Sequence, residues 1–378
     1  MNTVTIADSI QLPSTTDLQD QEEAQQPSSV PDLANLAGAL RVVAIGGGTG
    51  LSTLLRGLRQ HVTSCHLPAC ASGPIDSPST HSIADLAAVV TVTDDGGSSG
   101  RLRKGFNMLP PGDLRNCMLA LSQEEDLLVQ LFAHRFREGG ALKGHNFGNL
   151  FVAALTEITG DFGQAIQLAS KILATRGRIY PVTTADVTLV ARMDDGSIVR
   201  GETAINASQL RIAELMLDPA SAAPLPETLE AIKRADLITV GPGSLYTSLI
   251  TNLLVQGIPS ALATARGVRV FVCNLMTEAN ESMGLTAADH IERIYTHTRA
   301  PIFDYALVNT APFSPETLAR YAAEGATPIE ADIARIEALG VQCIADNFAS
   351  EENVVRHAAG RVTNSLLALG RAALANRG

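Results

Sequence analysis

Five consecutive residues, Gly46-Gly47-Gly48-Thr49-Gly50, follow a short apolar run at residues 41–45. Glycine permits positive φ and lets a backbone approach a phosphate closely. Leucines at positions 51, 54, 55 and 58 have helical spacing, and a helix behind the loop would direct its free N–H groups at an anion. The segment therefore predicts a phosphate-binding loop. It lacks the third glycine of the dinucleotide pattern and the lysine of the Walker pattern, so a simple tight turn is the alternative.

Two carboxylates, Asp94 and Asp95, end a second apolar run, Ala87–Val92. A carboxylate in this place binds a ribose hydroxyl in dinucleotide folds. Paired carboxylates also hold Mg²⁺ together with substrate phosphates. We therefore expect at least one of them to bind the ligand or Mg²⁺. Capping of the turn into Gly96 is the alternative.

The loop Gly96–Gly100 has the spacing of a hydrolase nucleophile elbow around its serine. That motif needs a helix directly behind it, and residues 101–105 are few, basic and interrupted by glycine, so we expect no elbow. The hydroxyls of Ser98 and Ser99, with Arg101 behind them, instead predict an anion-binding loop. A solvated basic turn is the alternative.

Two further segments place polar side chains at the starts of expected helices. A Pro-Pro-Gly turn precedes Asp113, which we expect to cap its helix, and Arg115, which can pair with a carboxylate or phosphate. His145 lies in a glycine-bounded loop and has an ordinary pKa near neutrality, which makes it a ligand candidate. Asn146 and Asn149 either contact ligand hydroxyls or cap the following helix.

A third loop repeats the logic of the first one. The apolar run Leu237–Val240 leads into Gly241-Pro242-Gly243-Ser244, and a helix follows. We predict a second anion-binding segment that uses Gly241, Gly243, Ser244 and Tyr246. A serine-capped helix entry is the alternative.

Strands that alternate with helices predict a mostly parallel, doubly wound α/β sheet. Further strands are expected at 268–273 and 305–309, and helices at 51–59, 113–121, 124–136, 149–159, 162–173 and 363–374. Residues 187–193 and 197–200 flank Asp195-Gly196 and predict a hairpin in a small subdomain at about 180–225. In such folds ligands bind beyond the carboxyl ends of the strands.

The remaining organisation follows from composition. Residues 1–38 are rich in Gln, Asp, Ser, Thr and Pro and predict a disordered tail before one nucleotide-binding domain at 41–378. Residues 61–82 read as a surface insertion. The five cysteines are an odd number, which disfavours a disulfide framework. Four residues in the insertion fit no compact zinc spacing, namely Cys65, His66, Cys70 and His81.

The net charge is −11, which disfavours nucleic acid as a partner because a phosphate backbone requires a basic surface. No apolar run reaches the roughly 18 residues that would predict a membrane span. The N-terminus lacks a basic region followed by an apolar stretch, so no secretory signal is expected. A cytoplasmic location is the default expectation.

Several of these segments, taken in order, resemble the gluconeogenesis factor (YvcK-like) family. The resemblance covers roughly residues 41–310 and is carried by the runs Val43–Ser52, Thr91–Arg103, Leu109–Cys117, Gly144–Leu150, Gly241–Ser248 and Cys273-Asn274-Leu275-Met276-Thr277. It adds Asn274 to the ligand-binding residues. Where the family typically has Gln-Pro-Gly-Glu-Thr, this chain has Glu278-Ala279-Asn280-Glu281-Ser282, so contacts of that loop do not carry over.

The resemblance implies a Rossmann-like fold related to the 2-phospho-L-lactate transferases. It also implies a cytoplasmic protein that is needed for normal cell shape on gluconeogenic carbon sources and that binds a nucleotide sugar such as UDP-N-acetylglucosamine. Expected partners are this ligand, further copies of the chain and cell-wall synthesis proteins. The first hypothesis is therefore a regulatory binding protein. The second is a Mg²⁺-dependent phospho-group or nucleotidyl-type transferase.

Overall fold

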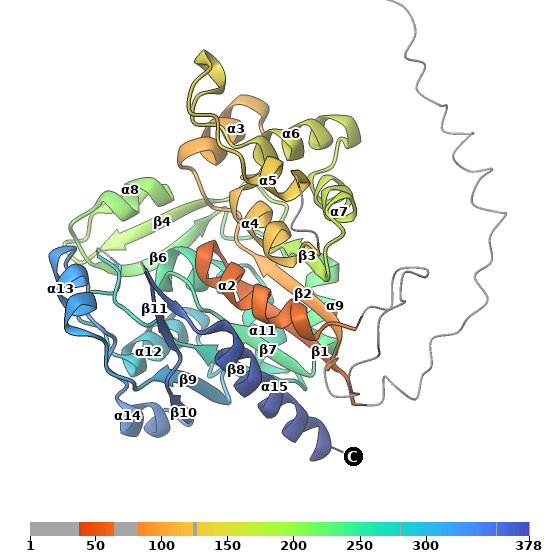
Figure 1. The fold of residues 1–378 in the computed structure, drawn as a ribbon. Coiled ribbons are helices and arrows are strands. Elements are labelled where there is room, and N and C mark those ends of the chain that lie inside the picture. The colour runs from red at the N-terminus through yellow and green to blue at the C-terminus, as the bar shows by residue number, and fades with distance from the viewer. Residues whose placement is uncertain (1–37, 64–81, 124–126, 280, 353, 378) are drawn as a thin grey trace, which may run out of the picture. The chain divides into compact units, whose positions relative to one another are not determined.

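The computed structural model describes residues 38–63, 82–123, 127–279, 281–352 and 354–377. The expected tail at 1–38, apart from its last residue, and most of the insertion at 61–82, including Cys65, His66, Cys70 and His81, lie outside the described residues. A seven-stranded sheet has the order β10-β9-β8-β7-β1-β2-β3, and all of its neighbouring strands are parallel (Figure 1). This confirms the expected α/β fold. The strands are β1 (Leu40–Gly46), β2 (Ile83–Val90), β3 (Arg178–Pro181), β7 (Leu237–Val240), β8 (Val268–Val272), β9 (Tyr305–Asn309) and β10 (Gln342–Asp346).

Helices cover both faces of the sheet, so the central strands are apolar on both sides. Six of the seven residues of β1 are buried. The exception, Arg41, forms an ion pair with Asp236 at 2.8 Å, which fixes the start of β1 beside β7. Helices α2 (Gly48–Leu58), α4 (Gly112–Leu121) and α15 (Ala359–Ala375) contact one another or the strands on one face. Helices α9 (Pro226–Arg234) and α11 (Ile258–Ala263) pack together near β1.

The strand order reverses between β1 and β7. Strands β2 and β3 extend the sheet on one side of β1, and β8, β9 and β10 extend it on the other side of β7. Such a reversal separates the connections on its two sides and leaves a crevice at the carboxyl ends of the strands. The loops that follow β1 and β7 are the two glycine-rich segments singled out in the sequence.

A small antiparallel sheet lies apart from the main one and has the order β5-β4-β6. Strands β4 (Thr188–Met193) and β5 (Ile198–Arg200) form the hairpin that the Asp195-Gly196 turn predicts. Strand β6 (Ile212–Asp218) pairs with β4 and was not expected from the sequence. Helix α8 (Glu202–Ala207) follows β5 and contacts both β4 and β5.

One expectation about a helix is wrong. Helix α3 (Gly97–Phe106) passes straight through residues 101–105, and Gly105 is the last residue but one of the helix. Glycine costs only about 1 kcal/mol inside a helix, and buried Leu102 anchors this one. The basic segment is therefore helical, so the elbow spacing around Ser98 has a helix behind it after all.

The other helices close to expectation are α5 (Leu127–Ala133), α6 (Phe147–Thr159) and α7 (Phe162–Ile172). The remaining elements are η2 (Arg59–His61), η3 (Gly140–Leu142), η4 (Leu245–Ile250), α10 (Thr251–Leu253), α12 (Ala287–Thr298), α13 (Pro315–Ala323), α14 (Ile333–Ala338), β11 (Ala349–Glu351) and β12 (Val355–His357). Within the described ranges, none of the helices combines the length and apolarity needed to cross a bilayer.

Candidate functional site

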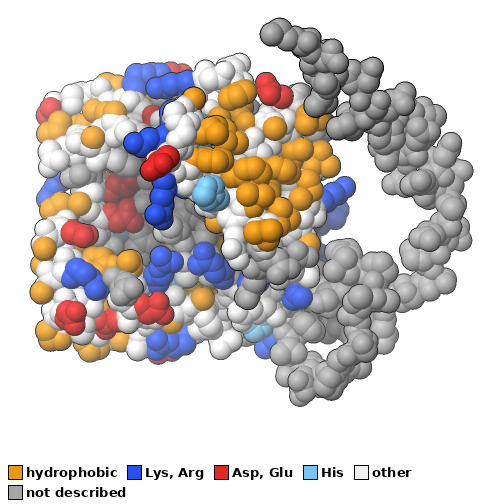
Figure 2. Space-filling model, turned by 45° about the horizontal axis from the view of Figure 1, so that its top comes forward, with side chains coloured by type: hydrophobic (Ala, Val, Ile, Leu, Met, Phe, Trp, Pro, Cys, Tyr) orange, Lys and Arg blue, Asp and Glu red, His pale blue; other side chains and the backbone are white. Residues whose placement is uncertain are grey.

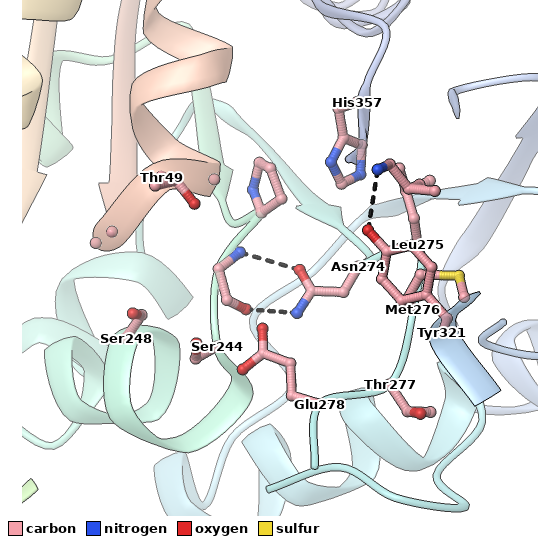
Figure 3. Close-up of a pocket in the computed structure, with 16 residues that line it drawn as sticks. Thr49, Ser244, Ser248, Asn274, Leu275, Met276, Thr277, Glu278, Tyr321 and His357 are labelled. Atoms are coloured by element: carbon pink, nitrogen blue, oxygen red, sulfur yellow. Dashed lines mark hydrogen bonds between the residues drawn. The ribbon is translucent and has the colours of Figure 1, made fainter. Parts of the chain in front are cut away.

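A pocket of about 240 Å³ opens at the carboxyl edge of the sheet, where the strand order reverses (Figure 3). Its walls come from five places in the chain: the first glycine loop, the loop after β7, the end of β8, helix α13 and strand β12. The lining residues are Gly47, Gly48, Thr49, Gly50, Pro242, Gly243, Ser244, Ser248, Asn274, Leu275, Met276, Thr277, Glu278, Tyr321, Val355 and His357. Both predicted anion-binding loops therefore face one pocket.

The first glycine loop needs its glycines for close packing. A Cβ atom on Gly47 would lie 2.7 Å from a methyl group of Thr91 and 2.8 Å from the carboxylate of Asp113. A Cβ atom on Gly50 would lie 2.5 Å from the backbone oxygen of Pro242 in the other loop. Gly48 has φ of +62° and open space around it. The loop after β7 can approach the first loop this closely only because Gly50 has no side chain.

Asp113 does not cap its own helix, so that expectation is wrong. The residue before the first turn of α4 is Pro111, which has no side-chain cap. The Asp113 carboxylate instead reaches across to the glycine loop and accepts a hydrogen bond from Gly48 N–H at 2.9 Å. Burial raises the pKa of Asp113 to about 6 despite this hydrogen bond.

The amides at the start of α2 are the groups of the first loop that suit the predicted anion. The opening N–H groups of a helix have no acceptor within the helix, and here these include Thr49 and Gly50. The Ser52 hydroxyl donates to Gly48 O at 2.9 Å within the helix. If the predicted anion binds in this loop, backbone amides and the Thr49 hydroxyl are the groups that face it in the pocket.

The second loop is held in place by Asn274, at the end of β8. Its side chain accepts from Gly243 N–H at 3.0 Å and donates to Gly243 O at 2.8 Å, as the paired dashed lines in Figure 3 show. Gly241 has φ of +89°, and a Cβ atom there would lie 2.6 Å from Val272 O. The sequence placed Asn274 at the site through resemblance, and the structure gives it a mechanical role in fixing Gly243.

A buried carboxylate occupies the helix start that follows this loop. The backbone N–H of Tyr246 donates to Glu281 at 3.1 Å, and the Thr247 hydroxyl donates to the same carboxylate at 2.6 Å. Burial raises the pKa of Glu281 to about 7, and burial also raises the pKa of the neighbouring Glu278. Glu278 itself lines the pocket and lies close to Ser244 (Figure 3). The Tyr246 amide thus already has a carboxyl group of the protein as its acceptor.

Three pocket residues lie outside every segment singled out in the sequence, namely Tyr321, Val355 and His357. They come from α13 and from the β11–β12 hairpin, where the Tyr321 hydroxyl accepts from Val355 N–H at 2.9 Å. Burial lowers the pKa of His357 to about 4, and its Nε2 lies 2.9 Å from Cys273 O. No glycine loop or motif marks these residues, so the sequence carried no signal for them.

Asp94 and Asp95 point in different directions. Asp94 accepts from Gly96 N–H at 2.9 Å, which is the turn-capping alternative. Asp95 accepts from the amide and the hydroxyl of Thr203 at 2.8 and 2.5 Å, at the start of α8. Among the described residues, no three His, Cys, Asp or Glu side chains are grouped as metal ligands. A role for Asp94 and Asp95 in binding Mg²⁺ stays a prediction.

A carboxylate that the sequence did not single out lies near Asp94. Glu202, at the start of α8, accepts from the Thr93 hydroxyl at 2.9 Å. Burial, together with the negative charges of Asp94 and Asp113, raises the pKa of Glu202 to about 8. Asp94 in turn lies beside Gly112 at the start of α4, where a Cβ atom on Gly112 would be 3.2 Å from its carboxylate. The acidic side chains of Asp113, Asp94 and Glu202 thus lie in succession between the first glycine loop and α8.

The remaining predicted residues gather around Ser98, on the side of α3 and α6. Ser98 lies 3.2 Å from His145, and Asn149 bonds both Ser98 and the buried guanidinium of Arg115. Asn146 caps α6, as one alternative expected, because its side chain accepts from Asn149 N–H. Arg101 donates to Lys143 O at 3.0 Å, and buried Ser99 lies beside Gly112. None of these residues lines the pocket.

Figure 2 looks onto the upper face of the molecule and shows a hollow bordered by Lys and Arg side chains, with acidic side chains inside it. Hydrophobic side chains gather on one side of this hollow. On α5 and α6, Leu127 and Ile158 are 78% and 79% exposed.

Comparison with known proteins places this geometry in a family. Residues 42–349 match the family described as 2-phospho-L-lactate transferase CofD. A gluconeogenesis factor of Halalkalibacterium halodurans is 45% identical over 327 residues, which cover 86% of this chain and 95% of that protein. The gluconeogenesis factor of Bacillus subtilis is 42% identical and covers 87% and 98% of the two chains. A crystal structure of a Bacillus halodurans protein superposes with a TM-score of 0.80 at 44% identity, covering 87% and 99% of the two chains.

The chain belongs to the CofD family and, within it, to the gluconeogenesis factors. The expected relationship to the 2-phospho-L-lactate transferases is confirmed.

Proposed function

We propose that this chain is a cytoplasmic regulatory protein that binds a nucleotide sugar of the UDP-N-acetylglucosamine type. Its role would be that of a gluconeogenesis factor required for normal cell shape during growth on gluconeogenic carbon sources. One observation carries the proposal: glycine loops from the adjacent strands β1 and β7 face the same pocket at the switch point of the sheet. Nucleotides bind at this place in doubly wound folds.

The chemistry of the pocket fits a diphosphate. The start of α2 provides amides and a helix dipole, and Thr49, Ser244 and Ser248 provide hydroxyls. The volume of about 240 Å³ is below the roughly 300–1,000 Å³ of drug-sized ligand pockets. The pocket would therefore hold the phosphates and one ring, while the rest of the ligand extends along the edge of the sheet toward Asp94 and His145.

The pocket favours binding over catalysis. Its histidine, His357, has a lowered pKa and lies within hydrogen-bond distance of a backbone oxygen, so it is a poor general base at neutral pH. Within the described part of the chain, the lining contains no Lys or Arg side chain, and its carboxylate, Glu278, lies beside the Ser244 hydroxyl (Figure 3). The alternative is a transferase that moves a phospho or nucleotidyl-type group, as the description of the matching family indicates.

Calorimetric titration with UDP-N-acetylglucosamine, with and without Mg²⁺, tests the proposal. We expect binding that Gly48→Val abolishes, because valine strains a backbone with φ of +62° and fills the pocket. Prolonged incubation should leave the ligand intact. Product formation that is lost in Asp94→Asn would instead establish the transferase. Absence of binding to every nucleotide and nucleotide sugar would reject both.

We also propose that the partners of this protein include further copies of the chain and cell-wall synthesis proteins. The exposed apolar side chains on α5 and α6 support a contact surface there. Light scattering of the purified chain and of Ile158→Glu tests the first of these partners. An oligomer that the substitution dissociates would support self-association through this face, and a monomer at all concentrations would contradict it.

A further inference from the structure

The hydroxyl of Ser98, at the start of α3, is the centre of a buried hydrogen-bond network. Ser98 is 4% exposed. Its oxygen lies 3.2 Å from His145 Nδ1, 3.3 Å from the backbone nitrogen of Asn146 and 3.2 Å from Asn149 Nδ2. The directions of these three bonds can be worked out, because the network ends on groups that can only donate.

The starting point is Arg115, whose guanidinium has donors and no acceptor. One of its nitrogens donates to Asn149 Oδ1 at 2.9 Å. The amide of Asn149 is thereby oriented, with its oxygen toward Arg115 and its NH₂ group toward Ser98. The amide of Asn146 is oriented in the same way, because its Nδ2 donates to Ala133 O at 3.0 Å and its Oδ1 accepts from Asn149 N–H.

A serine hydroxyl has one hydrogen to donate and two lone pairs that accept. Asn149 Nδ2 and the Asn146 backbone N–H are both donors, so they fill the two lone pairs of Ser98. The hydroxyl hydrogen is then left for His145 Nδ1. This nitrogen must accept, so it carries no proton. Burial and the positive charge of Arg101 lower the pKa of His145 and favour its neutral form.

We propose that Ser98 is a positioning residue that holds His145 as the neutral tautomer with its proton on Nε2. A chain of hydrogen bonds fixes the orientation: Arg115 orients Asn149, Asn149 orients the Ser98 hydroxyl, and that hydroxyl orients the imidazole. His145 thus offers one N–H donor of fixed direction, and we assign it to an acceptor oxygen of the bound ligand. This last assignment rests on the proposed nucleotide-sugar function.

These hydrogen bonds also exclude a nucleophilic role for Ser98. The Gly-x-Ser-x-Gly spacing and the helix behind it satisfy two features of a hydrolase elbow. A nucleophilic serine, however, needs an exposed oxygen with a free lone pair, and it gives its proton to a base. In Ser98 both lone pairs accept hydrogen bonds and the oxygen is buried. Ser98 therefore orients the Nε2–H donor of His145 and does not act as a nucleophile.

Nitrogen-15 NMR of histidine-labelled protein tests the tautomer directly in the free wild-type chain. We expect an unprotonated Nδ1 and a protonated Nε2 for His145, with the exposed His134 as an internal reference. Ser98→Ala should give a mixture of tautomers, and Ser98→Thr, which keeps the hydroxyl, should restore the single form. A wild-type His145 that carries its proton on Nδ1 would overturn the proposal, as would an unchanged tautomer in Ser98→Ala.

Titration with UDP-N-acetylglucosamine separates this proposal from the function on which it partly rests. We expect the His145 Nε2 signal to shift on binding, and the affinity to fall about tenfold in Ser98→Ala and little in Ser98→Thr. If the ligand binds without a shift at Nε2, the donor assignment fails and the proposed function stands. If the nucleotide sugar does not bind while the tautomer follows Ser98 as expected, the positioning role stands and the proposed function fails.

Discussion

The carboxylate of Asp113, on α4, accepts a hydrogen bond from the backbone N–H of Gly48 at 2.9 Å. A side chain from one helix thus occupies the first amide of another. Any phosphate that enters the glycine loop must displace this carboxylate or bind beside it. Because like charges repel, Asp113 should weaken the binding of anions whenever it is ionised.

Asp113→Asn should therefore strengthen ligand binding at alkaline pH. Asparagine keeps an acceptor oxygen for Gly48 and removes the negative charge. Burial raises the pKa of Asp113 to about 6, so we expect a gain in UDP affinity of about tenfold at pH 8 and almost none at pH 5. Calorimetry at the two pH values measures this, with the exposed Asp195→Asn as control. Equal affinities for wild type and Asp113→Asn at pH 8 would contradict it.

Gly47→Ala should disrupt the site although it adds only one methyl group. Its Cβ atom would lie 2.7 Å from Thr91 and 2.8 Å from Asp113, so one or both of these side chains must shift. We expect a loss of about 1–3 kcal/mol in unfolding free energy, together with loss of UDP binding. Gly360→Ala is the matched control, because a Cβ atom there meets nothing within 4 Å. Urea denaturation that ranks both variants equally would show that the close packing has no cost.

Glu278→Gln tests the acidic side chain that departs from the family pattern. Glu278 lines the pocket beside Ser244, so its carboxylate faces the expected position of the phosphates. Glutamine has the same shape without the charge. We expect UDP to bind about fivefold to tenfold more tightly at pH 8, as measured by calorimetry. An unchanged or weaker affinity would mean that the phosphates lie elsewhere, and Glu324→Gln on the surface serves as control.

Glu202→Gln should change how stability depends on pH. Burial raises the pKa of Glu202 from 4.5 to about 8, so between these values the folded chain keeps a proton that the unfolded chain releases. The unfolding free energy therefore falls as the pH rises through this window. We expect Glu202→Gln to be more stable than wild type by about 1–2 kcal/mol at pH 8 and equal to it at pH 4. Urea denaturation at both pH values is the measurement, and parallel curves would reject the raised pKa.

Much of the fold could be predicted from local pattern alone. Strands β7 and β9 match the expected ranges residue for residue, because each is a short apolar run between polar turns. Strand β10 was missed because it is a partly exposed edge strand with polar residues at both ends. Helix α3 was not expected, because burial of Leu102 outweighs the small cost of Gly105 inside a helix and the sequence does not reveal that burial. In both cases tertiary packing determines the secondary structure, because the local sequence preference is weak.

The site was only partly predictable, for a different reason. The glycine loops and Asn274 follow strands, so their place at the carboxyl edge could be inferred from the fold class. The hydrogen-bond partner of Asp113 could not be predicted, because the bond to Gly48 joins residues from different elements. The place of His357 in the pocket could not be predicted either. The β11–β12 hairpin that carries it has no motif and lies near the C-terminal end of the sequence.

The pairing of β1 with β7 joins segments 195 residues apart, and this has a consequence for biosynthesis. The ribosome completes β1 and the first glycine loop early, but β7 and its loop, which form another part of the pocket, follow 195 residues later. At about 5–20 residues per second, the interval is roughly 10–40 s. During that time one edge of β1 has no partner, and a nascent chain has no complete pocket. Ligand binding can therefore stabilise only chains that have been translated through both halves of the sheet.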